Sequence, residues 1–365
     1  MRVIMNSLEK ARNKLNEIDK KMAELFTMRM SAVKAIAEHK IEHGLQITDS
    51  SREAEVITRN SELVSDKVIR EYYVNFIKNN ISISKDYQRR LIEGMKIAYS
   101  GTEGAFAHIA AKKLFPSARK IAYDNFECAY HAVENGSCDA VVLPIENSYN
   151  GEVGQVTDLM FSGSLYITDT IELPVSHDLL ALPGASLSDI KRVISHPQAL
   201  GQCASYIREK GFLQLEYANT ALAAKEVSRS NDKTLAAIAS EEAAEIFGLQ
   251  VLERNINAAR TNTTKFAVLS RAENRYETNS PNIHTSLMFA VRNEAGALAK
   301  AIEIIGKHGF NMRSLRSRPM KELLWQYYFY VEAEGNVNTD EGADMMLELR
   351  KCCDRLKSLG TYIKE

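Results

Sequence analysis

Basic side chains recur at helical spacing in the first part of the chain. Arg29 falls on one heptad line with Leu15, Met22 and Ile36, so a permanent cation is expected on an apolar seam. Its burial is costly unless an anion compensates for it, and a carboxylate of the same bundle is the alternative partner. Lys40 lies roughly 16 Å further along the same helix face. These two cations therefore have the spacing to hold a small dianion between them.

Arg12 lies on the same predicted helix as Arg29 but about 25 Å away and rotated from it. If Arg12 serves a site, that site is expected to belong to another chain. Ser84 and Gln88 stand one turn apart on a later helix. Taken alone, these two would be ordinary surface polar residues.

A second group of charged residues opens the next predicted helix. Asp49, Arg52 and Glu53 supply one cation and two acceptors, and Ser50 with Glu53 has the spacing of a capping box. Binding and helix capping both remain open as roles for this group.

These residues require helices to position them. Residues 7–95 contain no proline and a single glycine, Gly44, before Gly94, and their apolar residues recur at helical spacing. The pattern predicts one helix that ends near Gly44, a second that follows Asp49, and a third that follows Ser65 and Asp66 and runs to about Leu91. The first segment is therefore expected to be a helical bundle.

Composition restricts the class of protein. The chain has 365 residues, 45% hydrophobic and 25% charged, which predicts a globular protein of two or three domains. A formal charge of −1 gives no reason to expect nucleic acid or an anionic membrane as a partner. No apolar run has the length of a membrane span, and the N-terminus has no apolar stretch typical of a signal peptide, so a cytoplasmic location is expected.

Cysteine spacing bears on redox state and metals. The five cysteines have no metal-like spacing, so reduced structural thiols and no metal site are expected.

From residue 96 onward, short apolar runs alternate with helical patterns, as in an α/β sheet. The predicted strands lie at residues 96–100, 140–144, 165–168, 179–182, 192–194, 234–238 and 266–269. Residues 272–282 are polar and predict a linker. The last 80 residues or so follow a β-α-β-β-α-β pattern, which predicts a ferredoxin-like fold with its last strand, from about Arg355, at an edge.

The polar residues of the first segment match a known family in order and spacing. The segment resembles the helical chorismate mutase domain, which implies that it rearranges chorismate to prephenate without a cofactor and that two interlocked chains build each site. Lys40 and Gln88 would then donate to the ether oxygen. The eight matching residues are Arg12, Arg29, Lys40, Asp49, Arg52, Glu53, Ser84 and Gln88.

Four loops of the middle segment lie where an α/β sheet places ligands. The first, residues 101–107, is either an anion cradle or a tight turn. Residues 144–148 and 195–198 each follow an apolar strand, and residues 262–266 precede one. The four are similar to loops of prephenate dehydratase, whose two lobes resemble periplasmic binding proteins. The resemblance implies site residues Asn147, Ser148, Ser195, Gln202, Thr264, Lys265 and Phe266.

The dehydratase resemblance assigns roles and reveals departures. Thr264 would carry or relay a proton to the leaving hydroxyl of prephenate, and neutral hydrogen bonds would orient the substrate. Lys265 stands where the family has arginine, and Ala105 and Ala107 stand where it commonly has Thr and Ser. For His196 a helix cap is favoured over an acid, and Cys203 is expected to be inert.

The C-terminal segment resembles the ACT regulatory domain, which implies a phenylalanine site between paired domains. Arg316 replaces the family's glutamate, and a dimerisation module without a ligand is the alternative. The implied effector residues are Gly296, Ala297, Leu298, Asn311, Ser317, Arg318 and Pro319.

The whole chain therefore resembles the bifunctional enzymes of phenylalanine biosynthesis. The expected fold is multidomain: an all-α mutase bundle (1–94), an α/β two-lobed dehydratase domain (95–272), a linker (273–282) and an α+β ferredoxin-like ACT domain (283–365). Chorismate and prephenate are the expected substrates and phenylalanine the effector of a homodimer or homotetramer, with no cofactor. The rivals are an enzyme with only the mutase activity and a non-catalytic phenylalanine sensor.

Overall fold

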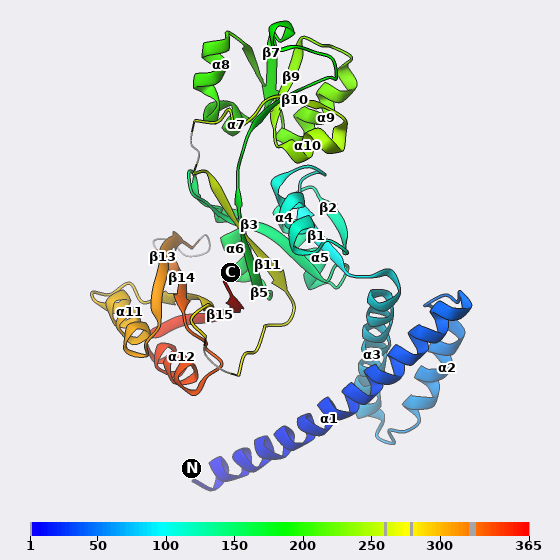
Figure 1. The fold of residues 1–365 in the computed structure, drawn as a ribbon. Helices are drawn as coiled ribbons and strands as arrows, with labels where there is room; N and C mark the ends of the chain where they lie inside the picture. The colour runs from blue at the N-terminus through cyan, green and yellow to red at the C-terminus, as the bar shows by residue number, and fades with distance from the viewer. Residues whose placement is uncertain (1, 259–260, 278–279, 321–325, 365) are drawn as a thin grey trace. The chain divides into compact units, whose positions relative to one another are not determined.

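The computed structural model describes residues 2–258, 261–277, 280–320 and 326–364. The chain divides into two compact units, Met1–Met95 and Lys96–Glu365. Figure 1 shows the course of the chain through both units. No helix among the described residues is long and apolar enough to cross a membrane.

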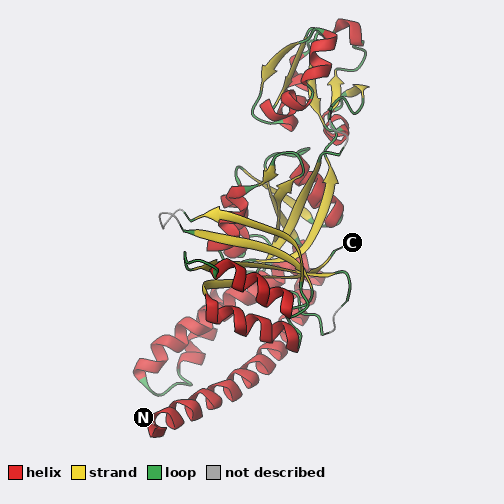
Figure 2. Cartoon of the chain, turned by 90° about the vertical axis from the view of Figure 1, so that its left-hand side faces the viewer, coloured by secondary structure: helices red, strands yellow, loops and turns green. Residues whose placement is uncertain are grey.

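Residues 2–95 form only helices and their connections (Figure 2). The helices are α1 (Arg2–His43), α2 (Ser50–Ser61) and α3 (Lys67–Glu93). Gly44 ends α1 with a φ of +63°, a conformation that glycine adopts without strain. Asp49 is the N-cap of α2 and accepts from the Arg52 amide, so the predicted Ser50 and Glu53 capping box is wrong. The side chain of Glu53 instead reaches Lys85 of α3.

The heptad seam of α1 is not buried within one chain. Leu15, Met22 and Ile36 are 57%, 44% and 49% exposed, and only Val33 and Ala37 of the described α1 side chains are buried. The expectation of a buried Arg29 is therefore wrong for the single chain, in which Arg29 is exposed together with these seam residues.

The second unit begins with a lobe built on a sheet in the order β2-β1-β3-β11-β5, to which β4 adds by pairing with β3. The strand β11 returns to this sheet from far along the chain and runs antiparallel to both of its neighbours. The elements are β1 (Lys96–Ser100), α4 (Phe106–Leu114), β2 (Arg119–Tyr123), α5 (Phe126–Glu134), β3 (Ala140–Asn147), β4 (Gly151–Glu152), α6 (Gly154–Ser162), β5 (Tyr166–Pro174) and β11 (Thr263–Ser270).

A second lobe has its own sheet, in the order β10-β6-β9-β7-β8. The two chain segments that connect the lobes are held together, because the Val175 amide donates to the Asn262 carbonyl and the Ile256 amide donates to that of His177. The elements are β6 (Asp178–Ala181), a 3-10 turn (Leu187–Asp189), β7 (Arg192–Ser195), α7 (Pro197–Gln202), α8 (Ala204–Lys210), β8 (Leu213–Glu216), α9 (Thr220–Ser230), β9 (Leu235–Ala239), α10 (Glu241–Phe247) and β10 (Gln250–Glu253).

The C-terminal sheet has the order β13-β14-β12-β15, the ferredoxin-like arrangement predicted from the sequence. One face packs on its helices, and the other joins the first lobe's core through Met288, Tyr330 and Tyr362. The elements are β12 (Ile283–Val291), α11 (Ala297–Lys307), β13 (Asn311–Pro319), β14 (Tyr327–Glu334), α12 (Asp340–Cys352) and β15 (Cys353–Ile363).

Each strand predicted from an apolar run is confirmed, and all but the one at residues 96–100 have shifted ends. Four strands were missed, and these are β2, β4, β8 and β10. Each is short, and none of the four contains a fully buried residue. The loop predicted at 262–266 is wrong from Thr263 onward, because β11 begins there.

Gly360 tests the packing of the C-terminal sheet on the first lobe. Its φ is +116°, and an added Cβ would lie 2.5 Å from the Ile167 carbonyl oxygen. We expect Gly360→Ala to destabilise the chain by about 1–3 kcal/mol, measured by denaturant unfolding. Gly306→Ala in α11 is the control, because nothing lies within 4 Å of its added Cβ. Equal midpoints for the two variants would contradict this account.

Candidate active sites

In the helical unit, the buried face of α3 is polar. Its buried residues are Asn80, Ser84 and Gln88, which are spaced four residues apart and therefore share one face. Arg29 of α1 donates to the Ser84 hydroxyl at 3.3 Å, and Lys40 donates to the Ile47 carbonyl at 2.7 Å. Arg29 is thus directed at α3 and Lys40 at the connection between α1 and α2, and neither has an acidic partner among the described residues.

Two buried acceptors of the same unit have no hydrogen-bond donor in the described part of the chain. They are Oε1 of Gln88 and Oε1 of Glu53, whose other oxygen lies 3.0 Å from Lys85 Nζ. A buried acceptor without a donor costs free energy, so each is suited to a ligand hydroxyl or amide. The helical unit therefore offers both cations and unsatisfied acceptors.

The remaining predicted residues of the unit lie elsewhere or serve the fold. Asp49 caps α2, and Arg52 pairs with Glu55 on the exposed side of that helix. Arg12 is exposed on α1. Among the described side chains, no hydrogen bond or ion pair joins Arg12 or Arg52 to Arg29.

In the second unit, Asn147 at the end of β3 is the centre of a buried polar network. Its Nδ2 donates to Thr264 Oγ1 at 2.9 Å and to Asn262 Oδ1 at 2.8 Å. Its Oδ1 accepts from the amides of Tyr149 and Asn150, both at 3.0 Å. Asn147 is therefore fixed from both ends, and the Thr264 hydroxyl proton is directed away from it.

The network continues into the second lobe through Gln202. Its Oε1 accepts from Asn262 Nδ2 at 3.1 Å and from His177 Nε2 at 2.8 Å. Burial lowers the pKa of His177, although the bond to Gln202 opposes the shift, so the imidazole is neutral at pH 7. Neutral amide, hydroxyl and imidazole groups of the two lobes therefore meet in this network, and the network carries no net charge.

Other predicted dehydratase residues have structural contacts. Ser195 is fully buried and donates to the Ile238 carbonyl, while Ser148 joins the strand ends through the carbonyl of Thr261 and the amide of Thr263. Phe266 is a core side chain. These contacts can order the cleft rather than line it.

Two structural interpretations are confirmed. His196 is the N-cap of α7 and accepts from the Gln198 amide. Cys203 is buried, which raises the pKa of its thiol to about 12 and keeps it protonated.

Lys265 points away from this network. It lies opposite Glu146 and Glu172 in the sheet, and its ammonium pairs with Glu332 of the C-terminal sheet. Only 8% of the Lys265 side chain is exposed.

The predicted effector residues fall into two groups, one at the start of α11 and the other along β13. Gly296 is the N-cap of α11 with a φ of +83°, Ala297 begins that helix and Leu298 packs on the core below it. Ser317 and Pro319 are exposed on β13. Asn311 donates to Glu334, and Arg318 makes two bonds to Asp158 of α6, at 2.6 and 2.9 Å.

Two family models match the chain, in the order that the fold suggests. The one described as Chorismate mutase type II matches residues 11–89, and the one described as Prephenate dehydratase matches residues 97–274. The bifunctional chorismate mutase/prephenate dehydratase of Buchnera aphidicola subsp. Acyrthosiphon pisum (strain APS) is 30% identical over 375 aligned positions, which cover 99% of this chain and 97% of that one. The chain belongs to this bifunctional family.

Two solved structures each resemble about three quarters of the chain. A prephenate dehydratase from Arthrobacter aurescens in complex with L-Phe is 27% identical with a TM-score of 0.68, and covers 74% of this chain and 90% of its own. GqqA, described as a novel type of quorum quenching acylase, is 31% identical with a TM-score of 0.68, and covers 74% of this chain and 98% of its own.

The sequence interpretation missed several residues of these networks. Asn80 had a detectable signal, since it lies one turn before Ser84 on the same helix face. Asn262 opens the hydroxyl-rich loop but was not assigned a role. Glu332 and Asp158 carried no local signal, because their partners are distant in sequence.

Asn262 tests the link between the lobes of this bifunctional enzyme. Asn262→Ala leaves Asn147 and Gln202 each short of one buried partner, which costs about 1–3 kcal/mol. We expect the kcat/KM for prephenate to fall about 10- to 100-fold with chorismate turnover unchanged. Asn274→Ala is the control, because Asn274 bonds Thr168 and Tyr276 outside the network. A normal kcat/KM for Asn262→Ala would exclude this role.

Proposed function

We propose that the helical unit rearranges chorismate to prephenate and that the second unit converts prephenate to phenylpyruvate. The rearrangement needs no nucleophile, so the site must hold a flexible dianion compactly and stabilise charge on the breaking ether bond. Arg29 supplies a planar guanidinium for a carboxylate. Lys40 and Gln88 donate to the ether oxygen, and Glu53 accepts from a substrate hydroxyl.

For the second reaction, the Asn147 network supplies neutral hydrogen bonds and one free hydroxyl proton. As the carboxylate leaves as carbon dioxide, its bonding electrons enter the ring and the ring hydroxyl departs as water. Thr264 carries or relays the proton to that hydroxyl. Asn147 and Gln202 orient the substrate without stabilising its carboxylate charge, which would slow the decarboxylation. The observation that supports this most is the buried contact between Thr264 and Asn147.

Assembly and regulation belong to the same proposal. The exposed apolar seam of α1 supports a homodimer or homotetramer in which Arg12 of one chain completes the partner's mutase site. Phenylalanine is proposed to bind near Gly296 and Ser317, as the L-Phe complex of the Arthrobacter aurescens enzyme supports. A cytoplasmic location is proposed from the reduced cysteines. The domain limits 1–94, 95–272, 273–282 and 283–365 stay part of this proposal.

An acylase reaction is less well supported. It would require an activated nucleophile, yet Ser148 and Ser195 donate to backbone carbonyls and the Cys203 thiol is protonated. Prephenate supplied to the purified protein decides the question, because phenylpyruvate formation supports the dehydratase. If the protein consumes chorismate but forms no phenylpyruvate, the mutase-only rival is selected. If it carries out neither reaction, the phenylalanine sensor is the remaining rival.

Lys40 tests the mutase assignment. We expect Lys40→Ala to lower chorismate turnover by about 100- to 1,000-fold, as removal of a donor to a developing charge does elsewhere. Prephenate turnover should stay unchanged. Lys34→Ala on the same helix is the control, because Lys34 is exposed and makes only a 3.9 Å surface pair with Glu38. Loss of both activities in Lys40→Ala would mean that the two sites are not separable.

Thr264 tests the dehydratase assignment. We expect Thr264→Ala to lower prephenate turnover by about 100-fold or more while its affinity changes little, because a proton carrier acts in the transition state. Thr264→Ser keeps a hydroxyl and should restore most of the turnover. Steady-state kinetics on the full chain measure both quantities, and an effect confined to affinity would remove the proton-handling role.

A further inference from the structure

A row of alternating charges crosses the dehydratase sheet. Glu146 of β3, Lys265 of β11 and Glu172 of β5 are register partners on three neighbouring strands. Residues directly opposite one another point to the same face of a sheet. A carboxylate, an ammonium and a second carboxylate therefore stand side by side.

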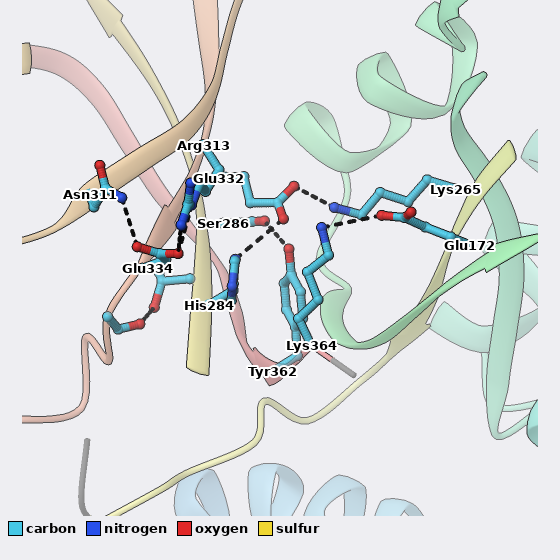
Figure 3. A network of polar contacts seen from close by, with 12 residues as sticks. Glu172, Lys265, His284, Ser286, Asn311, Arg313, Glu332, Glu334, Tyr362 and Lys364 are labelled. Atoms are coloured by element: carbon cyan, nitrogen blue, oxygen red, sulfur yellow. Dashed lines mark hydrogen bonds and ion pairs between the residues drawn. The ribbon is translucent and has the colours of Figure 1, made fainter. Parts of the chain in front are cut away.

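The C-terminal sheet meets this row with the opposite charges. Figure 3 shows two of the ion pairs, one at Lys265 and one at Glu172. The pair that includes Lys265 is nearly excluded from solvent, with side chains 8% and 5% exposed. The side chains of the other two pairs, at either side of it, are more exposed. The three ion pairs are Arg316 with Glu146, Glu332 with Lys265, and Lys364 with Glu172.

The surroundings of Glu332 keep its carboxylate charged. Its Oε1 lies 3.4 Å from Nδ1 of the buried His284, which stacks on Tyr362. Burial raises the pKa of Glu332, but the charge and hydrogen bond of Lys265 together with the nearby Lys364 and His284 outweigh it and hold the pKa below its ordinary value. Removing either partner of such a pair leaves an uncompensated buried charge, so the contact resists separation of the two sheets.

The same strands carry the polar residues of the cleft. Asn147 follows Glu146, and Thr264 precedes Lys265, so the charged and the polar pair are adjacent steps of one ladder. Successive side chains of a strand point to opposite faces. The ion pairs therefore hold one face of β3 and β11 while the Asn147 to Thr264 contact lies on the other.

We propose that Lys265 and Glu332 are positioning residues of the dehydratase: their ion pair anchors β11 to the C-terminal sheet and fixes the Thr264 hydroxyl against the Asn147 amide. The proposal rests on the proposed dehydratase function. Lys265 then acts through its strand and not on a substrate carboxylate. The C-terminal sheet becomes part of the catalytic apparatus, and an effector that moves it would change turnover through Glu332.

Kinetics of the full-length enzyme test this role in Lys265→Met, Glu332→Gln and the double variant. Each single change should lower the kcat for prephenate about tenfold or more with little change in KM, because orientation and not binding is lost. Chorismate turnover in the same preparations should not change. The double variant should be no slower than the worse single variant, since the two residues act as one unit.

Matched variants separate positioning from general damage. Glu334→Gln, two residues along β14, removes a carboxylate that bonds Asn311 and Arg313 of its own sheet, and should keep the wild-type kcat. Lys265→Arg keeps the charge and should restore turnover relative to Lys265→Met. If the single variants do not fold, the double variant remains informative, because it buries no unpaired charge.

The outcomes are distinct. A double variant with the wild-type kcat for prephenate overturns the positioning role, and so does a rise in KM alone, which would place Lys265 on the substrate. A wild-type protein that consumes chorismate but leaves prephenate unchanged overturns the proposed dehydratase function, and the positioning role with it. A reduced kcat with normal KM and normal chorismate turnover supports both.

Discussion

The alternation of side chains along β11 links the polar cleft of the second unit to the packing of its C-terminal sheet. Thr264 and Lys265 are neighbours in sequence, yet one lies in the polar cleft and the other in a dry ion pair with the C-terminal sheet. A strand cannot move one residue without moving the next, so catalytic geometry and sheet packing are set together. This coupling gives a physical reason why residues 96–365 form a single compact unit.

Local signals accounted for most of the fold. Helix ends at Gly44 and Asp66 and the strand runs at residues 96–100 and 192–194 were predictable, because caps and apolar periodicity depend on neighbours in sequence. Short strands with little burial, such as Arg119–Tyr123, gave no such signal. The Asp49 cap was misassigned by one residue because Asp and Ser are both good N-caps.

The candidate sites were predictable only as residue types. Hydrogen bonds join Asn147 to Thr264 directly and to Gln202 through Asn262, but the orientation of Lys265 depends on Glu332, which is 67 residues away in the chain. Arg316 shows the same limit: the departure from the family motif places a cation opposite Glu146. Such pairings follow from sheet register and from packing between sheets, which no local pattern encodes.

The length of α1 has a consequence for how the two reactions depend on protein concentration. Its 42 residues extend about 63 Å, with apolar side chains in contact with water along much of that length. Association of two chains would remove this surface from water, and mass action then makes the integrity of the helical unit a function of how much protein is present. The α/β unit draws its core from its own chain. Dilution should therefore impair the mutase reaction of the helical unit while the dehydratase reaction continues.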